Sequence, residues 1–363
     1  MFRKSLLLLT LSFCLCLPAF SQEITPPKLE AVATLEKHQP LIQEAIALHD
    51  QQLFDAAIAK YEKVLAENPH DTLALYELGF SYSAKGEYKK ALEVAYKGAQ
   101  YKSKNLVGFY VLIGNNLDNL NDSEKAIKVY KSALNLFPHE PQLHFNLAVT
   151  YLKLRRNEDG KKSIKDTMIA DPNYRSSHYI LGQLYFQERY KIPALLAVCR
   201  FLIVEPNSQR SAGALQALRD TLQQGVSKGD KENTINIQID PTPGKKDEGD
   251  FDSVAAILPL LMATRTLEKN KDKSEMQLTV ENFESFFAVL DESSADKKSS
   301  GFAWNYYRPY FVEMKKRNHV EAFTYYIYQT SGIPGVLKWL QQNAAKVQEF
   351  LDWSQSYKWS NGK

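Results

Sequence analysis

Cysteine is scarce in this 363-residue chain, which contains only Cys14, Cys16 and Cys199. The first two lie within a leader-like segment at the start of the sequence. If that segment is removed, Cys199 stands alone and no internal disulfide can form. The mature chain must then be stabilised by its core, and about 340 residues are ample for one.

An excess of charge of either sign is also missing. The chain has 45 basic and 42 acidic residues, a formal net charge of +3. Loss of Arg3 and Lys4 with the leader would leave 43 basic residues against 42 acidic ones. A near-neutral chain has no electrostatic footprint for nucleic acid or for an anionic membrane surface. We therefore expect no nucleic-acid partner.

The apolar segment near the start of the chain is too short for a membrane span. Leu6–Leu17 has twelve residues, whereas a transmembrane helix needs about 20. Basic residues precede it, and Ala19 and Ser21 supply the small side chains that a signal peptidase reads. The pattern predicts a signal peptide at 1–21, with a retained anchor as the alternative. We expect an exported, periplasmic or secreted protein, bacterial rather than eukaryotic, whose mature chain has no stable membrane insertion.

What the chain does contain is a pattern of small residues that returns every 34 or 35 residues. Its members are Ala57, Ala91, Ala126, Gly160 and Ala194. A second series runs in phase ahead of it, at Ala45, Gly79, Gly114, Ala148 and Gly182. Proline closes four of the five units, at Pro69, Pro138, Pro172 and Pro206. This period predicts stacked helical hairpins, because small residues let paired helices approach closely.

The spacing of these residues resembles the tetratricopeptide repeat. The resemblance is carried in the second unit by Leu75, Leu78, Gly79, Tyr82, Gly86, Tyr88 and Ala91. We interpret residues 38–208 as five such repeats, at 38–71, 72–106, 107–140, 141–174 and 175–208. The predicted fold class is all-α, a right-handed helical solenoid of the tetratricopeptide type followed by a small helical C-terminal domain.

The other segments lack the repeat. We expect an N-terminal segment at 22–37, a capping helix at 209–227, a solvated linker at 228–251 and a helical aromatic-rich domain at 252–363. The linker includes a short strand at 234–239. The last domain is predicted to contain helices at 254–267, 280–290, 302–314, 320–329 and 334–354. Thr279 is positioned to cap the second, and the last has an apolar stripe of Leu337, Leu340, Ala344, Val347 and Leu351.

The resemblance also implies a binding face. In tetratricopeptide repeats the first helix of each unit lines a concave groove. The residues expected there are Tyr76, Phe80, Asn115, Phe145, Asn146, Tyr179, Gln183 and Phe186. This face is aromatic, rich in amides and almost free of charge, so it lacks the cations that grip a terminal carboxylate. It suits an extended or helical apolar segment of another protein. Alternatively, some of these rings pack between neighbouring repeats.

A search for catalytic and metal-binding motifs finds none. His144 and His178 occupy the same position in adjacent repeats, where core packing is favoured over a metal pair. Cys199 is expected to be a buried, inert thiol. We therefore predict no catalytic residue, no metal site and no cofactor.

The sequence favours an exported, non-catalytic scaffold that binds a protein or peptide segment of unknown identity. One alternative is that 252–363 forms a glycan-binding or enzymatic module, with the repeats as a docking arm. The aromatic residues that suggest this module lie beside Arg308 and Lys315–Arg317 in the sequence. We interpret them instead as core residues, and they are Trp304, Tyr307, Phe311, Phe323 and Tyr326. A further alternative places the last helix in the chain's own groove.

Overall fold

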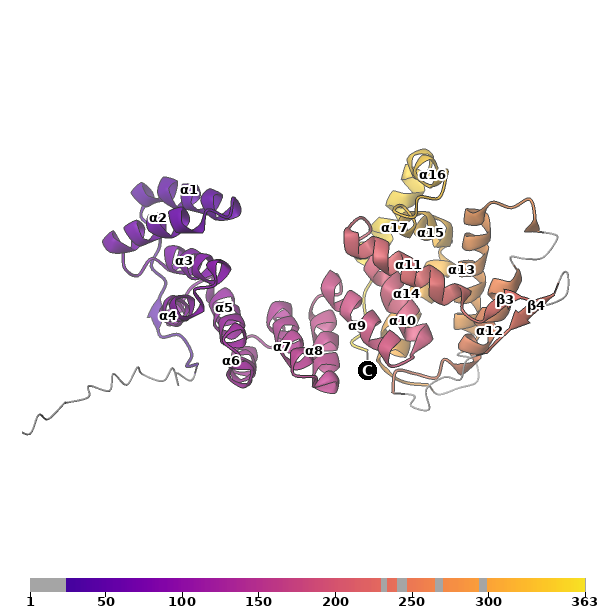
Figure 1. The fold of residues 1–363 in the computed structure, drawn as a ribbon, viewed down its shortest axis with the longest axis horizontal. Helices are drawn as coiled ribbons and strands as arrows, with labels where there is room; N and C mark the ends of the chain where they lie inside the picture. Colours follow the sequence, from indigo (N-terminus) through magenta and orange to yellow (C-terminus); the bar gives the residue numbers. More distant parts are fainter. Residues whose placement is uncertain (1–23, 230–233, 240–246, 265–269, 294–298, 363) are drawn as a thin grey trace, which may run out of the picture. The chain divides into compact units, whose positions relative to one another are not determined.

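The computed structural model describes residues 24–229, 234–239, 247–264, 270–293 and 299–362 (Figure 1). The predicted signal peptide lies outside these residues. Two compact units are present. Unit 1 holds the chain up to Leu117 together with Lys131–Leu136, and unit 2 holds Asp118–Tyr130 and the chain from Phe137 onward. In the described parts of both units, no helix is long and apolar enough to cross a membrane.

Unit 1 is a stack of helical hairpins. Its elements are η1 (Glu36–His38), α1 (Gln39–Asp50), α2 (Phe54–Glu67), α3 (Thr72–Lys85), α4 (Tyr88–Gly98) and most of α5 (Leu106–Asn119), while α6 (Ser123–Leu136) is divided between the units. α1 packs against α2, α2 against α3, and α3 against α4. The small residues Ala45, Ala57 and Ala91 are completely buried in the core of this stack, as the repeat pattern predicts.

The ends of α3 show why these helices begin and stop where they do. Asp71 precedes the helix, and its Oδ1 accepts hydrogen bonds from the backbone N–H groups of Leu73 (3.1 Å) and Ala74 (3.0 Å). Such a cap satisfies N–H groups that have no partner inside the helix. At the other end Gly86 adopts a φ of 87°, a left-handed conformation that glycine accepts without strain and that ends a helix.

The predicted N-terminal segment includes an extended strap across unit 1, which we define as residues 29–34. Its first two residues form β1 (Leu29–Glu30), which pairs in parallel with β2 (Tyr101–Lys102). The carbonyl oxygen of Val32 accepts hydrogen bonds from the backbone N–H (3.0 Å) and the hydroxyl (3.1 Å) of Thr72. The strap is therefore fixed to the two ends of the second repeat, at Thr72 and at Tyr101–Lys102.

Unit 2 contains the predicted fourth and fifth repeats and the described helices that follow them. The repeat helices are α7 (Pro141–Lys153), α8 (Asn157–Ala170), α9 (Arg175–Gln187) and α10 (Lys191–Val204). The elements that follow are α11 (Gln209–Gln223), β3 (Val226–Lys228), β4 (Ile235–Ile237), α12 (Asp252–Ala263), α13 (Glu275–Glu292), α14 (Phe302–Lys316), α15 (Val320–Ile327), α16 (Val336–Gln342) and α17 (Ala344–Ser356). β3 and β4 form an antiparallel pair. The repeats therefore form an all-α helical solenoid, as predicted. The described chain after them is also mainly helical.

Helix α10 is the centre of unit 2. Every residue from Ile192 to Ile203 is buried, because α10 packs against α9, α11, α12, α14 and α15 (Figure 1). One apolar core extends from Ala148 in the fourth repeat to Phe350 in α17. The C-terminal helices thus share a core with the repeats, and autonomous folding of 252–363 stays a prediction.

Several predicted C-terminal elements are confirmed, and the predicted cap of α13 is wrong. The strand within 234–239 is β4, and the helices at 302–314 and 320–329 are α14 and α15. Thr279 does not cap α13 but lies inside it, where its hydroxyl donates to the Glu275 carbonyl (2.8 Å). The cap is Ser274, in a reciprocal capping box with Gln277.

The last predicted helix is interrupted. It consists of α16 and α17, which are separated at Asn343. The interruption changes the direction of the side chains, so a stripe drawn through both segments does not stay on one face. Leu337 is 64% exposed, whereas Val336 and Phe350 are buried. α17 packs against α15.

The predicted solvated linker is anchored at its end. Glu248 is completely buried, and its carboxylate pairs with the ammonium group of Lys165 on α8. The same carboxylate accepts hydrogen bonds from the Tyr185 hydroxyl (2.7 Å) and the backbone N–H of Ala303 (3.3 Å). The Glu248 carbonyl accepts from the backbone N–H of Trp304 (3.0 Å). One glutamate therefore joins α8, α9 and the start of α14.

Candidate functional site

The predicted groove residues of unit 1 lie on α3 and α5. The Phe80 ring is 45% exposed. It is stacked on the Tyr76 ring at a centroid distance of 6.4 Å and on the His49 ring of α1 at 4.9 Å. Asn115 on α5 is half-buried. We call His49, Phe80 and Tyr76 the aromatic row, because it continues from the first repeat into the second.

Tyr76 connects this row to the third repeat. Its ring meets the Phe109 ring edge to face at a centroid distance of 5.5 Å. A Cβ atom on Gly108 would lie 2.5 Å from Cε2 of Tyr76, so a side chain at this position would displace the ring. Tyr76 therefore packs between repeats, which is the alternative to groove lining that the sequence left open. It supports Phe80, which is the exposed member of the row.

Two carboxylates accompany the aromatic row. Glu77 follows Tyr76 on α3 and is half-buried, and Asp50 is exposed at the end of α1. Burial, together with the negative charge of Asp50, raises the pKa of Glu77 above its ordinary value. Within the described residues, neither carboxylate has a hydrogen-bond or ion-pair partner. The face was predicted to be almost free of charge, and its few charges include these two acids.

A buried tyrosine lies near both carboxylates. Tyr61 on α2 is completely buried, and its hydroxyl has no hydrogen-bond partner in the described structure. Burial, followed by the charges of Glu77 and Asp50, raises the pKa of Tyr61. Sequence reasoning did not select His49 or Asp50. They stand at the twelfth and thirteenth positions of the first repeat, so the same register that selected Phe80 could have found them.

On α7, unit 2 places Phe145 and Asn146 next to each other. Phe145 is half-buried, and its ring lies 4.9 Å from the Tyr174 ring between centroids. The side-chain amide of Asn146 donates to the Gln142 carbonyl at 2.7 Å. The Asn146 amide nitrogen is thus occupied within its own helix.

The remaining predicted groove residues are on α9. Tyr179, Gln183 and Phe186 are all half-buried. The Tyr179 ring lies 5.0 Å from the Phe201 ring, and the Arg210 guanidinium lies over Tyr179 at 5.4 Å from its centroid. Arg210 is itself paired with a glutamate. The face of unit 2 is therefore more closely packed than the face of unit 1.

The two repeat histidines have structural roles. Nε2 of His144 lies 2.9 Å from the Pro138 carbonyl oxygen, and Nε2 of His178 lies 2.9 Å from the Pro172 carbonyl oxygen. Because a carbonyl can only accept, these nitrogens donate. Nδ1 of His178 then accepts from the Tyr307 hydroxyl at 2.9 Å. Burial lowers the pKa of His178 to about 3. Among the described residues, no three His, Cys, Asp or Glu side chains gather as a metal would require.

The C-terminal rings that suggested a glycan platform lie in the core. Trp304, Tyr307, Phe311 and Phe323 are buried. Tyr326 is half-buried and packs against the same core. The neighbouring Arg308 donates to the backbone carbonyls of Leu290 (2.9 Å) and Asp291 (3.1 Å) at the end of α13. The interpretation of these rings as core is confirmed.

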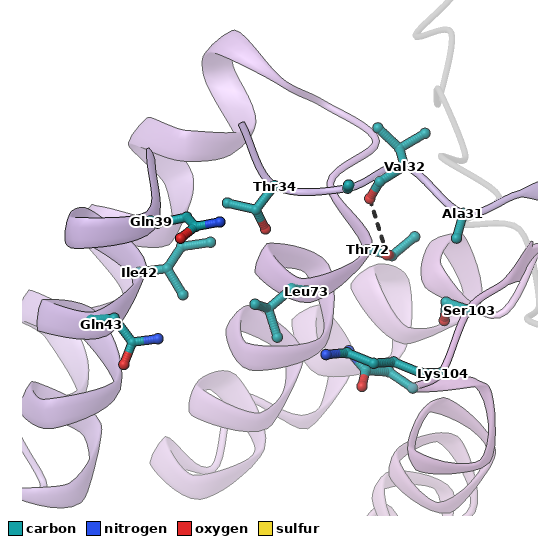
Figure 2. Close-up of a pocket in the computed structure, with 12 residues that line it drawn as sticks. Ala31, Val32, Thr34, Gln39, Ile42, Gln43, Thr72, Leu73, Ser103 and Lys104 are labelled. Carbon is teal, nitrogen blue, oxygen red and sulfur yellow. Dashed lines mark hydrogen bonds between the residues drawn. The ribbon is translucent and has the colours of Figure 1, made fainter. Parts of the chain in front are cut away.

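Unit 1 also contains a pocket that the sequence did not predict. It has a volume of about 460 Å³ and lies below the strap (Figure 2). Its walls come from the strap, from α1, from the start of α3 and from the loop before α5, and include Thr34, Gln39, Ile42, Leu73, Ser103 and Lys104. The lining has hydroxyl groups, amides and one lysine but no acidic side chain. None of the predicted groove residues lines it.

Two family models match this sequence, and both describe the tetratricopeptide repeat. They cover residues 48–96 and 107–140. The chain contains tetratricopeptide repeats. The first match begins in α1 and ends in α4, and the second includes α5 and α6, so the matched tetratricopeptide hairpins are those of the first three repeats.

Three known proteins show a partial likeness to this chain. YpiA of Bacillus subtilis (strain 168), a TPR repeat-containing protein, is 23% identical over 164 residues, which are 45% of this chain and 38% of YpiA. The anaphase-promoting complex subunit CDC16 of Saccharomyces cerevisiae is 28% identical over 120 residues, 31% of this chain and 14% of CDC16. The solved structure of PilF from Pseudomonas aeruginosa has a TM-score of 0.44 at 21% identity, over 51% of this chain and 87% of that one. The chain thus matches less than half the length of either curated relative, and the likeness concerns the fold alone.

Proposed function

We propose that this chain is an exported, non-catalytic scaffold whose repeats hold a segment of a partner protein. Tetratricopeptide repeats are protein-interaction modules, and stacked repeats present extended surfaces made of successive first helices. The observation that carries the proposal is the exposed Phe80 ring on its rigid support in the aromatic row.

The energetics of such a ring suit a binding anchor. A Phe side chain buries about 200 Å² when it is fully covered. Covering the 45% that is exposed on Phe80 would contribute about 2 kcal/mol at 25 cal/mol per Å². The stacked neighbours already restrict the ring, so little side-chain entropy is lost on binding. Single aromatic residues of this kind often dominate a protein interface.

Site-specific photocrosslinking tests this binding role. A benzoylphenylalanine residue replaces Phe80, and in a matched control it replaces Lys97, which is exposed on α4. Irradiation of producing cells should attach partner protein at position 80 and not at position 97. Identical adducts at both positions, or adducts at position 97 alone, would contradict the role of this face.

Export is a separate part of the proposal and rests on the sequence of residues 1–21. Cleavage after Ser21 would give a mature chain that begins at Gln22. Mass spectrometry of the protein recovered from outside the cytoplasm should find that new terminus. An unprocessed chain that stays in the cytoplasm would refute export and leave the binding role open.

Residues 252–363 are assigned to the scaffold. Stacked repeats need an end that protects their core from water. α12, α14 and α15 cover the fifth repeat in this way by packing on α10. A glycan-binding or enzymatic role is not proposed, because the rings that suggested it are in the core.

A further inference from the structure

We propose that the partner segment carries a lysine or arginine whose side chain lies along Phe80, with its cationic group at Glu77 and Asp50. This inference rests on the proposed function, because it specifies the chemistry of the segment that the repeats hold. The site lies entirely in unit 1, where α1 ends beside the middle of α3.

Unpaired charge is the first reason. Several half-buried or exposed carboxylates of unit 1 have cationic partners: Glu67 pairs with Lys37, and Glu87 pairs with Lys85. Glu77 is half-buried and close to a second acid, and no cation among the described residues compensates it. A carboxylate removed from water without a partner is unfavourable in the free protein. A cationic ligand would remove that penalty.

The neighbouring groups do not supply the missing charge. His49 stacks on Phe80, and burial lowers the pKa of His49, so this imidazole is neutral at pH 7. Its Nδ1 is already hydrogen-bonded to the Ser81 hydroxyl at 2.8 Å. The site therefore has two acids and no cation of its own.

The orphaned hydroxyl of Tyr61 is an independent sign. A completely buried hydroxyl almost always has a hydrogen-bond partner, yet that of Tyr61 has none in the described structure. It lies close enough to Glu77 and Asp50 for their charges to act on it. The buried Tyr61 hydroxyl and the half-buried Glu77 carboxylate are thus incompletely satisfied in the free protein, whereas Asp50 is exposed to water. A donor-only group such as an ammonium or a guanidinium supplies what the two carboxylates lack, and it leaves the buried Tyr61 hydroxyl untouched.

The shape of a basic side chain also fits. Lysine and arginine have aliphatic stems that cover apolar surface while the charged end stays with polar groups. The exposed Phe80 ring offers apolar surface. Glu77 lies three residues before it on α3, about one turn away on the same face of the helix. A guanidinium can form two parallel hydrogen bonds with one carboxylate. The aromatic row would therefore bind the stem, and the acids the charge.

The test uses peptides selected from a displayed random 12-residue library on the intact chain. Affinities are measured by fluorescence anisotropy for the intact chain, for Phe80→Ala and for Glu77→Gln. Glu93→Gln is the matched control, because Glu93 is exposed on α4 and the change in charge is the same. Far-ultraviolet circular dichroism verifies that each variant is folded, and Asp50→Asn is a second neutralising variant.

We expect peptides that lose binding on Phe80→Ala to contain a basic residue. Replacing that arginine with citrulline, or lysine with norleucine, should weaken binding about 10-fold, as should Glu77→Gln. The two changes together should weaken binding little more than either alone, because both remove one interaction. Glu93→Gln should have no effect.

Two contrary results are distinguishable. If peptides depend on Phe80 but tolerate citrulline or norleucine, or if Glu77→Gln and Asp50→Asn match Glu93→Gln, the inference is wrong and the proposed function stands. If no selected peptide depends on Phe80, the binding role of this face and the inference both fail.

Discussion

Replacing Lys165 with methionine should destabilise unit 2 by leaving a buried carboxylate without its countercharge. Glu248 is completely buried, and Lys165 is 19% exposed. Removing one partner of a buried ion pair costs about 3–5 kcal/mol. Tyr185 and the Ala303 N–H still hold the carboxylate in the variant, and water can reach the lysine side of the pair. We therefore expect a loss near the low end, about 3 kcal/mol.

A double variant separates the loss of charge pairing from the loss of the lysine stem. Adding Glu248→Gln to Lys165→Met replaces the unpaired carboxylate with a neutral amide of similar shape. Burying a neutral amide with hydrogen bonds costs much less than burying an isolated charge. The double variant should therefore be at least about 1 kcal/mol more stable than Lys165→Met alone.

Tryptophan fluorescence during urea denaturation is the assay, because it reports on unit 2 selectively. All four tryptophans of the chain lie there, at Trp304, Trp339, Trp353 and Trp359. The free energy of unfolding follows from the midpoint and slope of the transition. A change below about 1 kcal/mol for Lys165→Met, or a double variant no more stable than the single one, would refute the reasoning.

Three further predictions follow from titratable groups whose pKa is shifted by full or partial burial. The pKa of His178 is lowered to about 3 in the folded state against 6.5 for a free histidine, so unit 2 should lose stability between pH 6.5 and 3. The free energy of unfolding should fall by roughly 5 kcal/mol over this range. A folded His178→Gln variant should lose less stability over the same pH range, and a loss equal to that of the unaltered protein would contradict the prediction. The pKa of Glu77 is raised by burial and by Asp50, so its ionisation destabilises the folded state once the pH exceeds its ordinary value. Glu77→Gln should then raise the melting temperature of unit 1 at pH 7 but not at pH 4, as followed by circular dichroism, and an equal rise at both values would exclude that cause. Burial raises the pKa of the Cys199 thiol, so iodoacetamide should label it only in denaturant, and rapid labelling in native buffer would disprove its burial.

The repeat architecture could be predicted from sequence because its physical cause is local and periodic. Helices cross closely where a side chain is small, and this requirement recurs once per hairpin. Ala45, Ala57 and Ala91 are accordingly buried in the core of unit 1. The same register selected Phe80, which the structure exposes.

The surroundings of α10 could not be predicted from a repeat. Residues 192–203 are apolar on nearly every side of the helix, and a helix of that kind is buried on all faces. The composition thus indicated that something covers the fifth repeat. It did not indicate what, because α12, α14 and α15 share no periodicity with the repeats.

The exposure of individual groove rings was equally undetermined. Tyr76 and Phe80 are both aromatic residues at groove positions of α3. Tyr76 is covered because Gly108 in the next repeat admits its ring. Whether a ring faces a partner therefore depends on a residue in another repeat, and register alone does not contain that information.

The complete burial of α10 has a consequence for biosynthesis. A ribosome produces residues 192–203 well before α12, α14 and α15, and the shared core extends to Phe350. At 5–20 residues per second, the roughly 150 intervening residues need about 8–30 s. For part of that time a helix that is apolar on nearly all sides lacks α12, α14 and α15, which end at residues 263, 316 and 327. The growing chain is therefore most prone to aggregation, and most dependent on chaperones, at the stage when its repeats are already complete.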